Sequence, residues 1–229
     1  MKAINRIVTM IGIASLAAVS CNAPKEESTD GFRYLLDEFA DLKVIRYTVP
    51  GWEELSLQQK EYVYHLAEAA KWGRDIYWDQ NCAGNLALRK VLETIITEYD
   101  GDRECEDYKN FEVYAKRVFF SNGVHHHYAE DKFFPACSKE YFASLMAATG
   151  TSNEAVLNFD YDRENGLQRR STSSTGDIVK LSAVNYYEGV SRQEVEQFYR
   201  NVEDGSDPHP VAYGLNTKVV KNEEGKVVE

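Results

Sequence analysis

The sequence predicts a mainly helical α+β fold that ends in a β-hairpin. Apolar residues recur at helical spacing through most of the chain, which is the main signal for amphipathic helices. Near the end of the sequence, two valine-rich runs flank an Asn-Glu-Glu-Gly turn, as they do in a hairpin. With 229 residues, 43% of them hydrophobic, the chain is long enough to bury one core of substantial size.

The first residues have the composition of a secretory signal. Lys2 and Arg6 precede an apolar run, and small residues lead up to Cys21. The pattern resembles a bacterial lipobox, so we expect residues 1–20 to be a lipoprotein signal peptide and Cys21 to be the lipidated first residue of the mature chain. The alternative is a plain signal peptide followed by an incidental cysteine. Residues 21–31 then form a polar tether, and the expected location is the bacterial cell envelope.

The charge of the chain excludes one class of partner. The formal net charge of −11 becomes −13 when Lys2 and Arg6 are removed with the signal peptide. So acidic a chain is poorly suited to bind nucleic acid or acidic lipid headgroups. We therefore expect no nucleic-acid partner, and contact with the membrane only through the lipid anchor.

The remaining cysteines, Cys82, Cys105 and Cys137, are odd in number and lack the Cys-x-x-Cys spacing. A disulfide-framework fold and a cysteine zinc knuckle are therefore excluded. One disulfide with a spare thiol and three buried thiols both remain open.

Residues 32–205 are predicted to form the helical region. Apolar side chains at positions 32, 35, 36, 39 and 42 predict a first helix that ends near Leu42, and residues 44–49 are expected to be extended. Ser56 and Gln59 have the spacing of a capping box at the start of the next helix. Its single histidine, His65, is expected to pack and hydrogen-bond rather than to bind a ligand. Further helices are predicted at about 57–79, 86–99, 107–120, 138–146 and 191–202.

The end of the helical region contains a loop and a second capping box. The segment 167–176 is rich in Ser and Thr and is predicted to be a mobile loop. Ser191 and Glu194 have capping-box spacing, and Val190 and Val195 are placed as a hydrophobic staple.

The hairpin within residues 206–229 stands alone at the end of the sequence. An isolated two-stranded hairpin is only marginally stable in water. We therefore expect residues 206–229 to be the start of a β-barrel that this chain leaves incomplete.

The stretch Ser121–Pro135 gathers polar and aromatic side chains between two predicted helices. It contains three consecutive histidines and an Asn-Gly turn, and loops on a rigid scaffold are where binding residues concentrate. On an extended segment His125 and His127 point to the same side. Glu130 or Asp131 can add a carboxylate, and together these groups are the argument in favour of a metal site. We favour contact with a ligand in a cleft over a plain surface loop, and both over a metal site.

Four segments, taken in order, resemble the dipeptidyl peptidase III family of two-lobed zinc exopeptidases, particularly its bacterial members. The matching segments are Tyr62–Gly73, Ser121–Pro135, Asn185–Ser191 and Ala212–Lys218. The resemblance covers about residues 32–229, roughly the first third of a full-length member. It implies that the helices belong to the lower lobe, and that the hairpin supplies the first strands of that lobe's five-stranded β-barrel.

The family releases dipeptides from the amino end of oligopeptides, and its catalytic motifs are absent from this sequence. Zinc is held in the family by His-Glu-x-x-Gly-His and a downstream Glu-Glu-x-Arg/Lys-Ala-Glu/Asp motif, and neither occurs here. The resemblance thus implies no catalytic residue and no metal ligand in this chain, although the full-length family uses zinc. It does imply contact with the oligopeptide substrate by His127 and Tyr128, and secondarily by Asn122 and His126.

Two functions therefore remain open from the sequence. One is the N-terminal portion of a zinc-dependent dipeptidyl peptidase, inactive by itself. The other is a lipid-anchored, non-catalytic peptide-binding protein.

Overall fold

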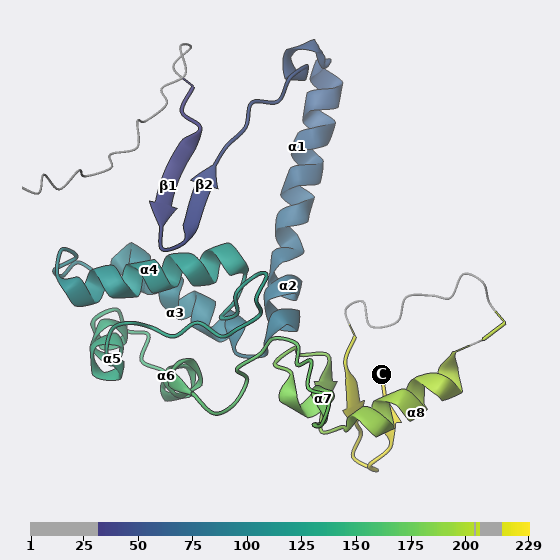
Figure 1. Cartoon of the computed structure of the whole chain (residues 1–229). Coiled ribbons are helices and arrows are strands. Elements are labelled where there is room, and N and C mark those ends of the chain that lie inside the picture. The colour runs from purple at the N-terminus through teal and green to yellow at the C-terminus, as the bar shows by residue number, and fades with distance from the viewer. Residues whose placement is uncertain (1–31, 204, 207–216) are drawn as a thin grey trace, which may run out of the picture.

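A computed structural model describes residues 32–203, 205–206 and 217–229 and shows a mainly helical α+β fold with small sheets (Figure 1). The predicted signal peptide, Cys21, the polar tether and most of the Ala212–Lys218 segment lie outside the described residues. Within the described ranges, no helix has both the length and the apolar character needed to cross a membrane.

The first described residues form a β-hairpin where we predicted a helix. The apolar residues Leu35 and Phe39 satisfy both a helical and an alternating pattern, so their spacing does not decide between the two. The backbone reverses at Ala40, which has a positive φ of 49°. Asp37 pairs with Lys116 at 3.0 Å and Asp41 with Arg117 at 3.1 Å, which fixes the hairpin turn against helix α4 (Glu106–Ser121). The elements of this part are β1 (Leu35–Phe39), β2 (Leu42–Ile45) and the short 3-10 turn η1 (Trp52–Glu54).

The predicted helix 57–79 is present but interrupted at Gly73. It forms α1 (Leu57–Trp72) and α2 (Arg74–Asn81), and the predicted capping box at Ser56 is confirmed. Figure 1 shows α1 projecting away from the other helices, and it has no buried residue. His65 is accordingly exposed, so the packing role expected for it is wrong.

The main core is built by α2 together with the four helices that follow. The predictions at 86–99, 107–120 and 138–146 are confirmed, and a further helix, α6 (Glu154–Tyr161), packs against α3 and α5. The four helices are α3 (Asn85–Glu98), α4 (Glu106–Ser121), α5 (Lys139–Ala148) and α6 (Glu154–Tyr161). The largest fully buried side chains are Trp78, Leu88, Leu92, Ile95, Phe111, Phe142, Leu145 and Met146.

The three cysteines of the described residues are free thiols. Cys82 and Cys137 are buried and Cys105 is half-buried, so no disulfide joins them. Burial raises the pKa of the Cys82 and Cys137 thiols, which keeps both protonated and unreactive at neutral pH.

A second, smaller core lies at the C-terminal end. The predicted hairpin is confirmed as an antiparallel pair, but its first strand also pairs in parallel with a strand that was not predicted. The expectation that the hairpin stands alone is therefore wrong, and within the described residues the sheet is open and three-stranded. The elements are α7 (Ile178–Leu181), β3 (Tyr187–Glu188), α8 (Arg192–Val202), β4 (Val219–Lys221) and β5 (Val227–Val228).

Helix α8 covers this sheet through the predicted hydrophobic staple. Val190, Val195 and Val219 are buried together, and the capping box of Ser191 with Glu194 is confirmed at the start of α8. The hairpin is thus stabilised by a helix and a third strand, which an isolated hairpin in water would need.

Candidate functional site

The loop Ser121–Pro135 leaves α4 through a tight turn that is held from behind. Asn122 ends the helix with a positive φ of 53°, and Gly123 has a φ of 146°. The fully buried Asn85 donates from Nδ2 to the Trp78 carbonyl at 3.0 Å and accepts from the Val124 amide at 3.1 Å. Because one side chain satisfies groups on both sides, the start of the loop is fixed to α2 and α3.

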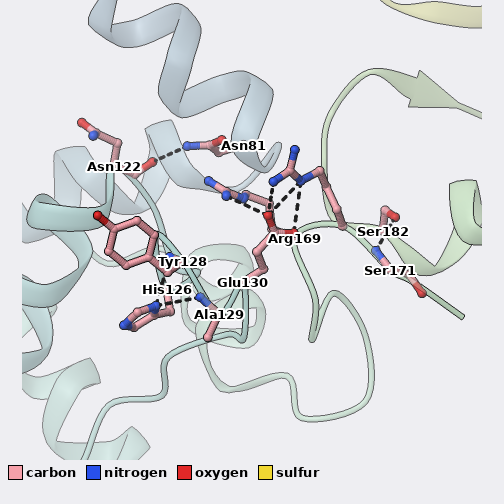
Figure 2. Close-up of polar contacts among 10 residues, drawn as sticks. Asn81, Asn122, His126, Tyr128, Ala129, Glu130, Arg169, Ser171 and Ser182 are labelled. Atoms are coloured by element: carbon pink, nitrogen blue, oxygen red, sulfur yellow. Dashed lines mark hydrogen bonds and ion pairs between the residues drawn. The ribbon is translucent and has the colours of Figure 1, made fainter.

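Asn122, predicted to contact substrate, has a structural task in this turn. Its carbonyl accepts a hydrogen bond from Asn81 Nδ2 at 3.2 Å (Figure 2). Asparagine tolerates the left-handed conformation better than other residues with a side chain, so it suits the end of a helix. The structure therefore gives Asn122 a reason to be present that needs no ligand.

His125 points into the protein and not toward the surface. It is 2% exposed, and its Nε2–H donates to the Gly166 carbonyl at 2.7 Å. Burial lowers the pKa of His125 to about 4, so the ring is neutral at physiological pH. His125 and His127 thus do not share an accessible face, which removes the arrangement on which the metal-site alternative depended.

His126 organises the loop around its own ring. Its Nδ1 accepts hydrogen bonds from the Tyr128 amide at 3.1 Å and the Ala129 amide at 3.0 Å (Figure 2). The proton therefore lies on Nε2, which is 3.7 Å from Asp41 Oδ2 at the turn of the β1–β2 hairpin. These bonds close a turn that leaves His127 half-buried and presents Tyr128 to solvent.

The structure brings three of the four predicted contact residues together. The His126 and His127 rings stack at 4.5 Å, and the His127 and Tyr128 rings lie 4.4 Å apart. His127 Nδ1 also lies 3.5 Å from the Ser121 hydroxyl, and Tyr128 is 84% exposed. We call His126, His127 and Tyr128 the ring face.

The ring face combines apolar ring surfaces with polar atoms that can hydrogen-bond. Partial desolvation and the neighbouring His126 lower the pKa of His127, which favours a neutral imidazole. A neutral imidazole and a phenol each offer both a donor and an acceptor. Such groups can bond to the N–H and C=O of a bound peptide while their rings contact its side chains.

The end of the loop near Glu130 is hydrogen-bonded to residues of the segment 167–176. Glu130 meets Arg169 at 3.0 Å and the Arg170 Nε at 2.9 Å (Figure 2). These two guanidinium groups, Arg170 more than Arg169, lower the pKa of Glu130 to about 2. The segment has neither helix nor strand, as expected of a loop, but its first residues are bonded to the histidine loop.

The carboxylates near the histidines thus have partners other than a metal. Glu130 is engaged by arginines, and Asp131 accepts a hydrogen bond from Gln168. Over the ranges that the structure describes, no three His, Cys, Asp or Glu side chains gather in a way that could hold a metal ion. The sequence could not reveal the arginine partners, because nearly 40 residues separate them from Glu130.

Two comparisons with known proteins were negative. No protein-family model matches the chain, and none of the curated proteins matches it.

Proposed function

We propose that this chain is the peptide-contacting N-terminal portion of a zinc-dependent dipeptidyl peptidase of the dipeptidyl peptidase III type. In this proposal its helices belong to the lower lobe of a two-lobed enzyme that releases dipeptides from the amino end of oligopeptides. The zinc ligands and the general base are supplied by sequence other than these residues, because neither family motif occurs in them.

The observation that carries the proposal is the ring face on its anchored loop. Tyr128 is 84% exposed although the turn that presents it is bonded to His126, and the loop begins at the buried Asn85. A binding surface that is already ordered loses little conformational entropy when it binds a ligand. An exposed tyrosine beside an imidazole is thus suited to bind the backbone and side chains of an extended peptide.

The acidic character of the chain supports the same substrate class. The formal net charge is −11, and a negative surface potential attracts cationic ligands. An oligopeptide with a free amino terminus carries a positive charge at one end. The negative chain therefore attracts the positive amino terminus of an oligopeptide, which is the end at which a dipeptidyl peptidase acts.

Peptide binding to the isolated chain tests the proposal. The probe is a set of short oligopeptides with a free amino terminus and a fluorophore at the carboxyl end, and fluorescence anisotropy gives Kd. Replacing an aromatic residue at the centre of a binding surface weakens affinity by roughly tenfold or more, so we expect this for Tyr128→Ala and His127→Ala. Tyr47→Ala is the matched control, because Tyr47 is 75% exposed but follows β2, away from the loop.

Equal affinity of Tyr128→Ala, His127→Ala and the wild type would contradict the proposal. So would equal weakening by Tyr47→Ala, because the binding would then not belong to the ring face.

A lipid-anchored, non-catalytic peptide-binding protein is the second candidate. It is supported by the donors and acceptors of the ring face, which belong to His126, His127 and Tyr128 themselves and need no metal to contact a peptide. Sequencing the gene past the codon of Glu229 and assaying its whole product with a dipeptidyl arylamide separates the two. We expect turnover that a chelator abolishes in the whole product and none in these residues alone. Peptide binding by a whole product that has no turnover would favour the second candidate.

A further inference from the structure

The turn that carries the ring face is closed by a residue in an unfavourable backbone conformation. Glu130 has a positive φ of 67°, which a glutamate rarely adopts because its Cβ then crowds a neighbouring carbonyl. Its amide donates to the His126 carbonyl at 3.0 Å, so residues 126–130 form one closed turn that contains His127 and Tyr128. Backbone strain of this kind persists only where surrounding contacts hold it, and it concentrates at functional sites.

The contacts that hold Glu130 come from the segment 167–176. Its carboxylate accepts from Arg169 Nη2 at 3.0 Å and from Arg170 Nε, which lies 2.9 Å from one oxygen and 3.1 Å from the other (Figure 2). The Glu130 carbonyl also accepts from the Arg169 amide at 2.9 Å. Hydrogen bonds between ionised groups are stronger than those between neutral groups. We call the pairing of Glu130 with Arg169 and Arg170 the carboxylate clamp.

The carboxylate clamp is partly withdrawn from solvent. The side chains of Glu130 and Arg169 are 14% and 11% exposed, whereas that of Arg170 is 66% exposed. Charge pairs that are partly buried are screened by salt much less than exposed pairs. The pair of Glu130 with Arg169 can therefore hold the turn in solution, and Arg170 adds a contact from the solvent side.

We infer that Glu130 is a positioning residue for the ring face, because the carboxylate clamp fixes the turn in the conformation that presents His127 and Tyr128. The inference rests on the proposed peptide-binding role of the ring face. A glycine would adopt this backbone conformation without strain, so the benefit of a glutamate at position 130 lies in its side chain. Without the clamp the turn would have to become ordered when a peptide binds, and the affinity would fall.

Glu130→Gly separates the effect of the carboxylate from that of the backbone. The substitution removes the clamp and relieves the strain together, so the chain should stay folded. We expect Kd for the oligopeptide probes to rise about threefold to tenfold, and hydrogen-exchange protection of the Tyr128 and Ala129 amides to fall by a similar factor. Protection in α3 should not change. The matched control is Ala40→Gly, because Ala40 also has a positive φ, of 49°, but carries only a methyl group.

A double-mutant cycle with Arg170→Met tests whether the two side chains act through each other. If Arg170 acts by holding Glu130, the double variant should bind peptide about as weakly as Glu130→Gly alone. Effects on Kd that add would mean that the two residues act independently, and they would overturn the inference. Because Arg170 is exposed, Arg170→Met should fold whatever happens to Glu130→Gly, and an unchanged Kd in this variant would also overturn it.

Three further outcomes distinguish a positioning role from other roles of Glu130. Equal loss of protection in α3 and in the turn would show a purely structural role and would contradict the inference. Equal weakening of peptide binding by Ala40→Gly would do the same, because the carboxylate would then not be the cause. So would wild-type affinity in Glu130→Gly, although the proposed function would stand.

The proposed function can fail without the positioning role. Faster exchange of the Tyr128 and Ala129 amides in Glu130→Gly, in a chain that binds none of the oligopeptide probes, would uphold the effect of Glu130 on the turn and overturn the proposed function.

Discussion

At the scale of single residues, the site depends on a glycine packed against a buried amide. A Cβ atom at Gly123 would overlap the Asn85 Nδ2 atom, far inside contact distance. Asn85 cannot move away, because both ends of its side-chain amide are hydrogen-bonded to backbone. The position of the ring face is therefore set by the close approach of these two residues.

Gly123→Ala should lower the free energy of unfolding by roughly 2–4 kcal/mol, since it adds a steric clash to an unfavourable φ. Gly150→Ala is the matched control. Gly150 also has a positive φ, of 68°, but a Cβ added there would meet no atom within 4 Å beyond its chain neighbours, so only about 1 kcal/mol of backbone strain is expected. Urea unfolding of both variants gives the comparison. Equal losses in the two would mean that the contact with Asn85 does not matter.

His125 and Asp160 should have opposite effects on the pH dependence of stability. The folded pKa of His125, about 4, lies below its ordinary value, so its contribution is present above about pH 6.5 and is lost as the pH falls toward 4. The folded pKa of Asp160, about 7, lies above its ordinary value, so its contribution is present below about pH 4 and is lost as the pH rises through 7.

Relative to the wild type, His125→Gln should therefore become less stable as the pH rises from 4 to 7, whereas Asp160→Asn should become more stable. We expect each difference to change by roughly 2–4 kcal/mol over this range. Denaturant unfolding at several pH values measures both. Two difference curves of the same sign would contradict the assignment of one buried neutral histidine and one buried acid.

At the scale of elements, the same capping motif occurs on two helices with different surroundings. The box at Ser56 begins α1, which has no buried residue, whereas the box at Ser191 begins α8, which packs on β4 through Val195 and Val219. A cap stabilises its helix by a similar amount in both places. Of the two capped helices, only α8 packs against a core.

Ser191→Ala should cost about 1 kcal/mol and should reduce hydrogen-exchange protection in both α8 and β4, because they unfold together. Ser56→Ala should speed exchange in α1 alone. The two variants are controls for each other, since the substitution and the motif are identical. Unchanged protection of β4 in Ser191→Ala would show that the small core does not depend on α8.

At the scale of the whole molecule, the described residues contain two cores of unequal size. The larger one, in α2–α6, carries the ring face, and the smaller one holds the C-terminal sheet. The projecting helix α1 belongs to neither, and its Tyr62, Tyr64 and Trp72 are exposed.

The attachment of the whole molecule to a membrane is a prediction about residues outside the described ranges. Cys21 follows small residues and an apolar run, so the mature chain should carry lipid at this position. Growth with a labelled fatty acid should label the wild type, and Cys21→Ala should lose the label. Cys105→Ala is the control, because Cys105 is a free, half-buried thiol elsewhere in the chain. Label that survives in Cys21→Ala would disprove the lipid anchor.

The sequence by itself determined the features whose causes lie close together along the chain. The capping boxes at Ser56 and Ser191 depend on residues three positions apart, and the helices of the main core follow from apolar residues repeated every turn. The final hairpin follows from two valine runs around a turn that ends at Gly225, which has a φ of 76°. The proximity of His126, His127 and Tyr128 was likewise readable, since the three are consecutive.

Only the tertiary structure decided the features that depend on distant partners. The apolar pattern of residues 35–45 fits both a helix and a strand. The ion pairs of Asp37 and Asp41 with α4 hold this segment as a hairpin. Other such contacts also join segments that lie roughly 30 to 40 residues apart. They are the parallel pairing of β3 with β4, the bonds of the arginines to Glu130, and the hydrogen bonds that bury His125 and Lys132. Such contacts form only when burial and charge pairing outweigh the entropy of closing a long loop, and that balance is a property of the folded chain as a whole.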